Sequence, residues 1–116
     1  WPASDSLADW NLLPTKPDWA GGMRDFWQVG EGAAHARLEE WVESVCGYHN
    51  GRNLPSQAGS SRLSPHLHWG EISPVQVWHR LADTRGQGWQ TYAKELIWRD
   101  YAQNIIAEYP DYPRKS

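Results

Sequence analysis

The chain has 116 residues and a net charge of −3 at pH 7, from 14 acidic and 11 basic side chains. A chain of this length forms one domain at most and can bury a modest core. Its single cysteine, Cys46, excludes an internal disulfide and a zinc site made of several cysteines, and a cytoplasmic setting is expected. No apolar run is long enough to cross a bilayer, so we expect no membrane partner. Because the first residue is Trp1 and not Met, we expect a fragment of a longer protein.

The charges are unevenly distributed along the chain. Residues 1–46 hold eight acids and three bases, whereas residues 47–99 hold three acids and six bases. The overall sign argues against nucleic-acid binding, but a local basic patch could still contact phosphates. The basic side chains of the middle region are Arg52, Arg62, Arg80, Arg85, Lys94 and Arg99.

Residues 1–29 lack a sustained helical or strand period and contain three prolines, the Gly21-Gly22 pair and four of the nine tryptophans. We predict an extended connector held against a surface by its indoles. From Glu31 onward, apolar residues recur at helical spacing and predict an amphipathic helix of about four turns that ends near Gly47. Its apolar positions are Ala34, Leu38, Trp41, Val42 and Val45.

Residues 48–63 are rich in Gly, Ser, Asn and Pro and predict a loop. Ser64-Pro65 then reads as the N-cap and first residue of a short helix that stops at Gly70. Ser73-Pro74 repeats this signal for a second helix, which frays near residues 84–86. A last helix from about Trp89 to Tyr109 is apolar nearly all round and should be buried. With no period-two run and no hairpin turn, the predicted fold class is all-α, a partial helical bundle.

The segment that precedes the first short helix could hold a phosphate group. Gly59-Ser60-Ser61 combines small residues with hydroxyl donors, Arg62 adds a positive charge, and a helix start follows at Ser64. Tyr48 could close over the same ligand. A serine-rich loop before a capped helix is also common without any ligand, so the residues alone leave both interpretations open.

The same segment resembles the DNA photolyase/cryptochrome family. The resemblance is carried by Gly47-Tyr-His-Asn-Gly-Arg52, by Ser60-Ser-Arg-Leu-Ser-Pro65 and by the Gly70-Glu-Ile-Ser-Pro74 that follows. It implies an α-helical domain that binds FAD in a bent form. It also implies that Arg52 contacts DNA, although Asn53 replaces the usual Asp, and Ser60 stands where Thr is usual. The cofactor contacts it implies are Tyr48, Ser60, Ser61, Arg62, Leu63 and Ser64.

A second group of side chains follows forty residues later. On a helix, Glu95, Trp98, Arg99 and Ala102 share a face. A carboxylate, an indole and a guanidinium could accept a hydrogen bond from a base, stack on a base and bind a phosphate. An ordinary ion pair between Glu95 and Arg99 beside a core Trp98 is the structural alternative.

Glu95-Leu-Ile-Trp98-Arg99 resembles the family segment that lies between flavin and DNA. The resemblance implies that Glu95 and Trp98 bind and stack on the lesion, and that Arg99 contacts DNA or the pocket. Because animal cryptochromes and photolyases that repair (6-4) lesions usually carry Gln in place of Glu95, the resemblance favours a class I cyclobutane photolyase. Related single-strand-specific cryptochromes share the Glu, so they stay an alternative. Residues 1–29 would then be the interdomain connector and residues 30–116 the N-terminal part of the FAD-binding domain.

The full-length parent is therefore expected to be a light-driven lyase that splits cyclobutane pyrimidine dimers in UV-damaged DNA with reduced FAD. An antenna chromophore would bind a domain missing from this chain. The alternatives are a cryptochrome flavin domain without repair activity and a helical fragment that binds nothing. The isolated fragment is expected to bind FAD weakly, to be inactive and to self-associate. The five histidines have no spacing typical of metal ligands, so no metal is expected.

Overall fold

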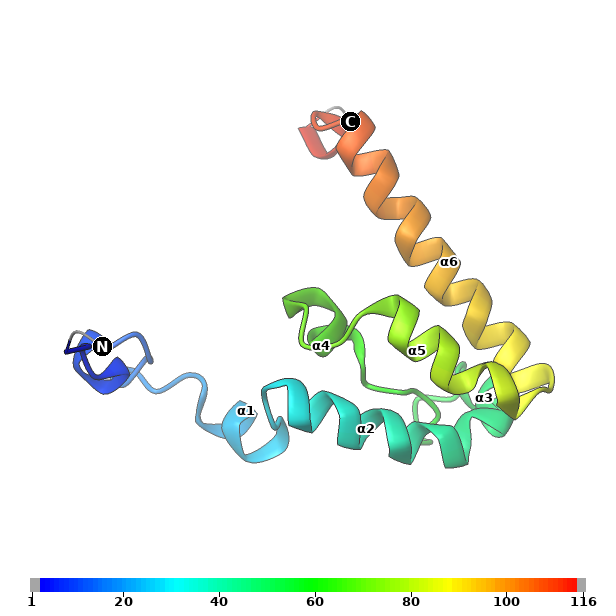
Figure 1. Ribbon diagram of the computed structural model, residues 1–116, viewed down its shortest axis with the longest axis horizontal. Helices are drawn as coiled ribbons and strands as arrows, with labels where there is room; N and C mark the ends of the chain where they lie inside the picture. Colours follow the sequence, from blue (N-terminus) through cyan, green and yellow to red (C-terminus); the bar gives the residue numbers. More distant parts are fainter. Residues whose placement is uncertain (1–2, 115–116) are drawn as a thin grey trace.

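The computed structural model describes residues 3–114, in which every regular element is a helix and no strand occurs (Figure 1). The predicted all-α fold class is confirmed. The α-helices are α1 (Gly21–Phe26), α2 (Glu31–Ser44), α3 (Tyr48–Gly51), α4 (Ser64–Trp69), α5 (Pro74–Leu81) and α6 (Gln87–Glu108). Short 3-10 turns are η1 (Leu7–Trp10), η2 (Val45–Gly47), η3 (Ala82–Thr84) and η4 (Tyr112–Arg114).

Helix α2 lies where the apolar period predicts it. Ala34, Leu38 and Trp41 face inward and are buried, and η2 continues the helix to Gly47. The acidic residues of α2 face solvent, so the helix is a surface helix with one apolar stripe.

The starts of α4 and α5 differ. Ser73 caps α5 with a full capping box: its Oγ accepts from the Gln76 backbone N–H at 3.1 Å, and the Gln76 side chain accepts from the Ser73 N–H at 2.8 Å. Ser64 was predicted to cap α4, but this prediction is wrong. Leu63 occupies the N-cap position without a side-chain cap, and Ser64 is the first helical residue. Gly70 ends α4 with φ of 73°, as the sequence predicts.

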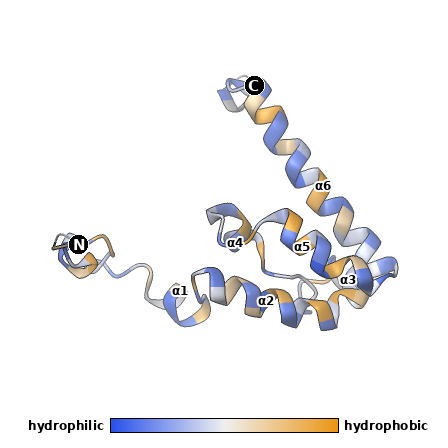
Figure 2. Cartoon of the chain, viewed as in Figure 1, coloured by the Kyte–Doolittle hydropathy of each residue, from blue (hydrophilic) through white to orange (hydrophobic). Residues whose placement is uncertain are grey.

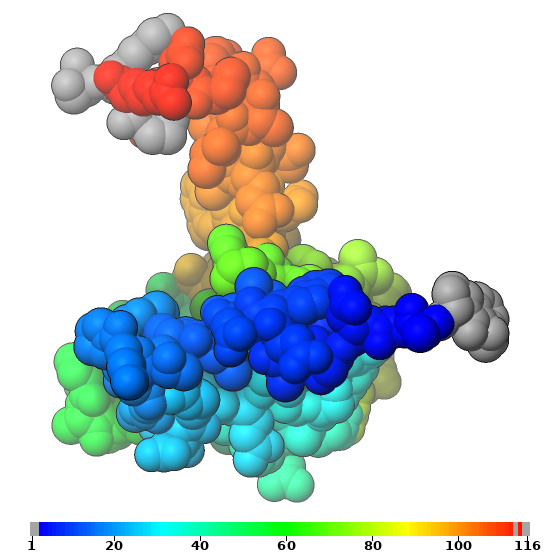
Figure 3. All heavy atoms as spheres, turned by 90° about the vertical axis from the view of Figure 1, so that its left-hand side faces the viewer, coloured from blue at the N-terminus to red at the C-terminus, as the bar shows by residue number. Residues whose placement is uncertain are grey.

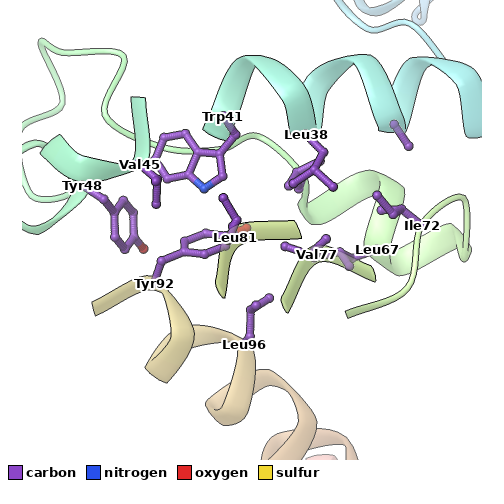
Figure 4. Packing of buried hydrophobic residues seen from close by; sticks show 12 residues of the cluster. Leu38, Trp41, Val45, Tyr48, Leu67, Ile72, Val77, Leu81, Tyr92 and Leu96 are labelled. Carbon is purple, nitrogen blue, oxygen red and sulfur yellow. The ribbon is translucent and has the colours of Figure 1, made fainter. Parts of the chain in front are cut away.

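The core lies where α2, α5 and the first half of α6 meet (Figure 4). Its fully buried side chains include Leu38, Leu63, Ile72, Val77 and Leu81. Hydrogen bonds to Glu71 at its edge fix the start of α2 against the turn between α4 and α5. The buried His66 ring donates from Nδ1 to Glu71 Oε2 at 2.5 Å, and Glu71 Oε1 accepts from the Gly30 N–H at 2.8 Å.

The second half of α6 stands clear of this core (Figures 1 and 3). The prediction that α6 is buried is therefore correct only for its first half, where Tyr92, Ala93 and Leu96 pack against α3 and α5. Ile97, Tyr101 and other apolar residues beyond them are exposed, and Figure 2 shows apolar positions continuing along the projecting helix. The radius of gyration is 17.9 Å, against about 13 Å for a compact domain of this length. No helix in the described range is both long and apolar enough to span a bilayer.

The N-terminal segment extends away from the bundle (Figure 1). Its indoles do not hold it against a surface as predicted, because Trp10 and Trp19 are exposed and Trp27 is half-buried; Trp1 lies outside the described residues. The glycine pair starts α1 and does not interrupt the chain.

Candidate functional site

A cavity of about 620 Å³ opens between α3, the loop before α4, α4 itself and α6. It is lined by residues from both of the segments that the sequence singled out, although about thirty residues separate them in the chain. The predicted residues that line it are Tyr48, Ser60, Ser61, Arg62, Ser64, Glu95 and Arg99. The fold therefore brings the phosphate-loop candidates and two of the lesion-facing candidates to one site.

Sequence reasoning missed several residues of the same cavity. They are Leu67, His68, Tyr92, Leu96 and Gln103. The helical period could have found those on α6, because Tyr92 lies three residues before Glu95 and Gln103 four residues after Arg99. Nothing in the sequence marks His68, which depends on the path of α4.

Two aromatic rings, those of Tyr48 and Tyr92, line the cavity, and Trp41 packs against both of them. The ring centroids of Trp41, Tyr48 and Tyr92 are 5.2 to 5.5 Å apart in edge or tilted geometry. Figure 4 shows Tyr48 and Tyr92 approaching Trp41 from α3 and α6. Burial raises the pKa of both phenols, Tyr48 and Tyr92, so both stay protonated at neutral pH. The cavity thus has a rigid aromatic side with neutral hydroxyl groups.

The serine loop is fixed to this aromatic cluster. Tyr92 donates from its hydroxyl to Ser61 Oγ at 3.0 Å, and Ser61 Oγ also accepts from the Leu63 backbone N–H at 3.3 Å. The Leu63 side chain is fully buried in the core, and Leu63 does not line the cavity. The resemblance implies the same cofactor contact for all five loop residues, but the structure separates Leu63 from the other four.

Arg62 adopts a left-handed conformation, with φ of 56°. Its guanidinium lies 5.0 Å from the ring centroid of Phe26, which follows from the end of α1 packing beside the loop. The contact fixes the charged end of Arg62 at the wall of the cavity.

Glu95 and Arg99 do not form the ion pair that their spacing allows. Glu95 Oε1 accepts from Arg52 Nη1 at 2.5 Å, across α6 and the end of α3. Arg99 Nη2 donates to the Leu67 carbonyl at 2.9 Å and so ties α6 to α4. The hydrogen bond with Glu95 raises the pKa of the Arg52 guanidinium above its ordinary value.

Trp98 does not join Glu95 at the cavity. Its side chain is 62% exposed and contacts Tyr101, with the ring centroids 5.6 Å apart. The reason is helical geometry: at about 100° per residue, the cavity-facing positions of α6 centre on Arg99, and Trp98 points about 100° away from it. Ala102 also does not line the cavity.

The six basic residues do not form one continuous patch. Arg80 pairs with Glu39 at 2.5 Å across α5 and α2, and Arg52 pairs with Glu95. Of the six, Arg62 and Arg99 line the cavity. Within residues 3–114, no group of three potential metal ligands is found.

The cavity combines serine hydroxyls, two guanidinium groups and an aromatic side. Hydroxyl and guanidinium donors suit phosphate oxygens, and aromatic rings suit planar groups. The donor set therefore fits a phosphate-bearing aromatic molecule, with one carboxylate, Glu95, left to accept hydrogen bonds.

The chain is similar in sequence to named photolyases. No protein-family model matches the chain. The chain is 38% identical over 124 residues to the deoxyribodipyrimidine photo-lyase of Agrobacterium fabrum, covering 100% of the chain and 25% of that protein. It is 32% identical over 111 residues to the enzyme of the same name from Streptomyces griseus, covering 94% and 23%.

A solved structure has the same fold. It is a bacterial class III photolyase from Agrobacterium tumefaciens, which matches with a TM-score of 0.86 and 39% identity over 96% of this chain and 24% of that one. The chain thus spans about a quarter of the length of the photolyases it matches. The class I expectation is not confirmed, because the matching structure is class III.

Proposed function

We propose that this chain is part of a light-driven, FAD-dependent DNA photolyase. Residues 1–29 form the connector and residues 30–116 the first part of the flavin-binding helical domain. The observation that carries the proposal is that two distant segments, each resembling a functional segment of photolyases, line one cavity. Similarity to named photolyases along the whole chain supports it.

The residues of the cavity fit a flavin dinucleotide. Ser60, Ser61, Ser64 and Arg62 supply hydroxyl and guanidinium donors for a pyrophosphate. A cofactor contact is assigned to Leu63 by the resemblance alone. Tyr48, at the start of α3, contributes its ring to the cavity wall. Reduced flavin, when bound, supplies the electron that opens the cyclobutane ring of a pyrimidine dimer.

The remaining roles concern UV-damaged DNA. Glu95, at the cavity wall, accepts hydrogen bonds from the dimer, and Arg99 contacts DNA or fixes the wall. Trp98 stacks on the lesion from the exposed side of α6, where 62% of its side chain is accessible. Arg52 is placed to contact DNA by the resemblance alone. An antenna chromophore would bind a part of the parent that this chain does not contain.

The decisive experiment uses the full-length protein. We would record its flavin spectrum and follow the loss of thymine dimers from irradiated DNA in blue light and in darkness. Light-dependent loss that is abolished by Glu95→Ala, but retained by Glu43→Ala as a surface control, supports the proposal. A flavin spectrum without repair would instead indicate a cryptochrome, and the absence of flavin would contradict both.

The isolated segment is a separate question. Because it holds about a quarter of a photolyase, we propose that it binds FAD weakly and repairs nothing. Equilibrium dialysis of the 116-residue chain against FAD tests this directly. Stoichiometric flavin retained after dialysis would contradict it.

A further inference from the structure

Arg52 acts on the cavity only through another side chain. It does not line the cavity, but its guanidinium is hydrogen-bonded to Glu95, which does. Its backbone N–H donates to the Tyr48 carbonyl at 3.0 Å, and its guanidinium lies 5.3 Å from the Tyr48 ring centroid. Arg52 is thus held at the end of α3 on the side of Tyr48.

The ion pair fixes one oxygen of the Glu95 carboxylate. Arg52 Nη1 lies 2.5 Å from Glu95 Oε1, and the two side chains are 31% and 40% exposed. In the described part of the chain, no hydrogen bond is formed to the second oxygen, Oε2. The bond from Arg52 thus occupies Oε1 and leaves Oε2 of this cavity-lining residue able to accept from a further donor.

The alternative partner for Glu95 is already engaged. Arg99, one turn further along α6, donates to the Leu67 carbonyl at 2.9 Å. Arg52 and Tyr48 both belong to the α3 region, and α3 packs directly against α6. The geometry of the carboxylate thus depends on an element forty-three residues away in sequence.

We propose that Arg52 is a positioning residue that acts through Glu95, and that it does not act by contacting the ligand or DNA itself. The proposal rests on the proposed function, since Glu95 is taken to accept hydrogen bonds from a damaged base pair. It changes the role that the family resemblance implies for Arg52. A direct phosphate contact and a positioning role predict different binding data.

The test measures binding of the full-length protein to two DNA duplexes that differ by a single thymine dimer. If Arg52 positions Glu95, Arg52→Gln weakens binding to the damaged duplex about tenfold and leaves binding to the undamaged duplex unchanged. Lys94→Gln is the matched control, because Lys94 is an exposed neighbour of Glu95 on α6 and its loss changes the charge equally. Circular dichroism establishes that each variant is folded.

A double-mutant cycle separates the two roles. The double variant Arg52→Gln with Glu95→Gln should bind damaged DNA no more weakly than Glu95→Gln alone, because Arg52 acts only through Glu95. Arg52→Lys, which keeps a donor, should recover part of the loss. If Arg52 instead contacts a phosphate, Arg52→Gln should weaken binding to both duplexes and add to the effect of Glu95→Gln. The slope of the logarithm of the binding constant against the logarithm of salt concentration should also become shallower by about one.

The two ways of failing are distinct. A wild-type protein that binds both duplexes equally would overturn the proposed function and the role of Arg52 with it. A wild-type protein that prefers the damaged duplex, while Arg52→Gln behaves like Lys94→Gln, would overturn the positioning role and leave the proposed function standing.

Discussion

Gly51 and Gly59 are in backbone contact, and this contact closes the loop that leads into the serine segment of the cavity. A Cβ on Gly59 would lie 2.5 Å from the carbonyl carbon and oxygen of Gly51, which is closer than real Cβ atoms come. Neither residue has a positive φ. The requirement for glycine here is therefore space and not conformation.

Gly59→Ala should push apart the backbone segments at Gly51 and Gly59 and destabilise the protein by about 1–3 kcal/mol. Gly47→Ala is the control, because nothing lies within 4 Å of a Cβ at that position. Urea unfolding of both variants measures the difference. Equal stability for the two variants would show that the loop adapts without cost.

The hydrogen bond between Tyr92 and Ser61 joins α6 to the serine loop. Tyr92→Phe removes the hydroxyl while keeping the ring, and should lower the free energy of unfolding by about 0.5–1.5 kcal/mol. Tyr101→Phe, on the exposed part of the same helix, should have little effect. If Ser61→Ala adds its full effect to that of Tyr92→Phe in a double variant, the bond is not formed in solution.

Acid should weaken the link between Glu71 and the start of α2. The hydrogen bond from His66, together with that from the Gly30 N–H, holds the pKa of Glu71 below its ordinary value of 4.5. A carboxyl group whose pKa is lower in the folded state contributes stability above pH 4.5, and this contribution is lost as the pH falls through the folded value. The stability of Glu71→Gln should therefore fall less steeply below pH 4.5 than that of the wild type.

Unfolding curves at several pH values between neutral and acid measure this slope. Glu43→Gln corrects for the loss of one surface carboxylate. A slope for Glu71→Gln as steep as that of the wild type would contradict the assignment.

The exposed apolar side of α6 should make the isolated segment self-associate. Ile97 is 57% exposed and borders a groove of about 420 Å³ with Val75 and Trp78. Ile97→Gln should raise the dissociation constant of the self-associated form about tenfold, because it removes apolar surface from the contact. Sedimentation over a range of concentrations tests this, with Lys94→Gln as the control on the same helix. A monomeric wild-type segment at every concentration would contradict the prediction.

The sequence predicted best where local chemistry decides the structure. Ser73 and Gly70 act as helix signals because capping and the left-handed conformation depend on neighbouring residues alone. The same is true of the apolar stripe of α2. Ser64 shows the limit of such signals. Leu63, whose side chain is buried in the core, occupies the N-cap position, and Ser64 is the first helical residue.

The sequence predicted seven of the residues that line the cavity but not the pairings between their side chains. The spacing of Glu95 and Arg99 allows an ion pair, but in the fold Glu95 pairs with Arg52 and Arg99 donates to a backbone carbonyl. The burial of α6 was overestimated. Its apolar composition indicates that the helix favours contact with another apolar surface, but it does not show that such a surface lies within this chain. His68 and the aromatic cluster of Trp41, Tyr48 and Tyr92 arise from tertiary packing, which no local pattern encodes.

Helix α6 supplies the cavity wall from Tyr92 to Gln103. These eleven steps span about 16 Å at the rise of an α-helix, so the wall is a straight edge with functional groups at fixed intervals: a phenol, a carboxylate, a guanidinium and an amide. A ligand that lay along this wall would meet these groups in a set order. If the ligand shifted by one helical turn, each of its polar groups would face a different side chain. If the cavity binds the proposed ligand, the order of groups on one helix should make the site selective for the register of a long ligand as well as for its chemistry.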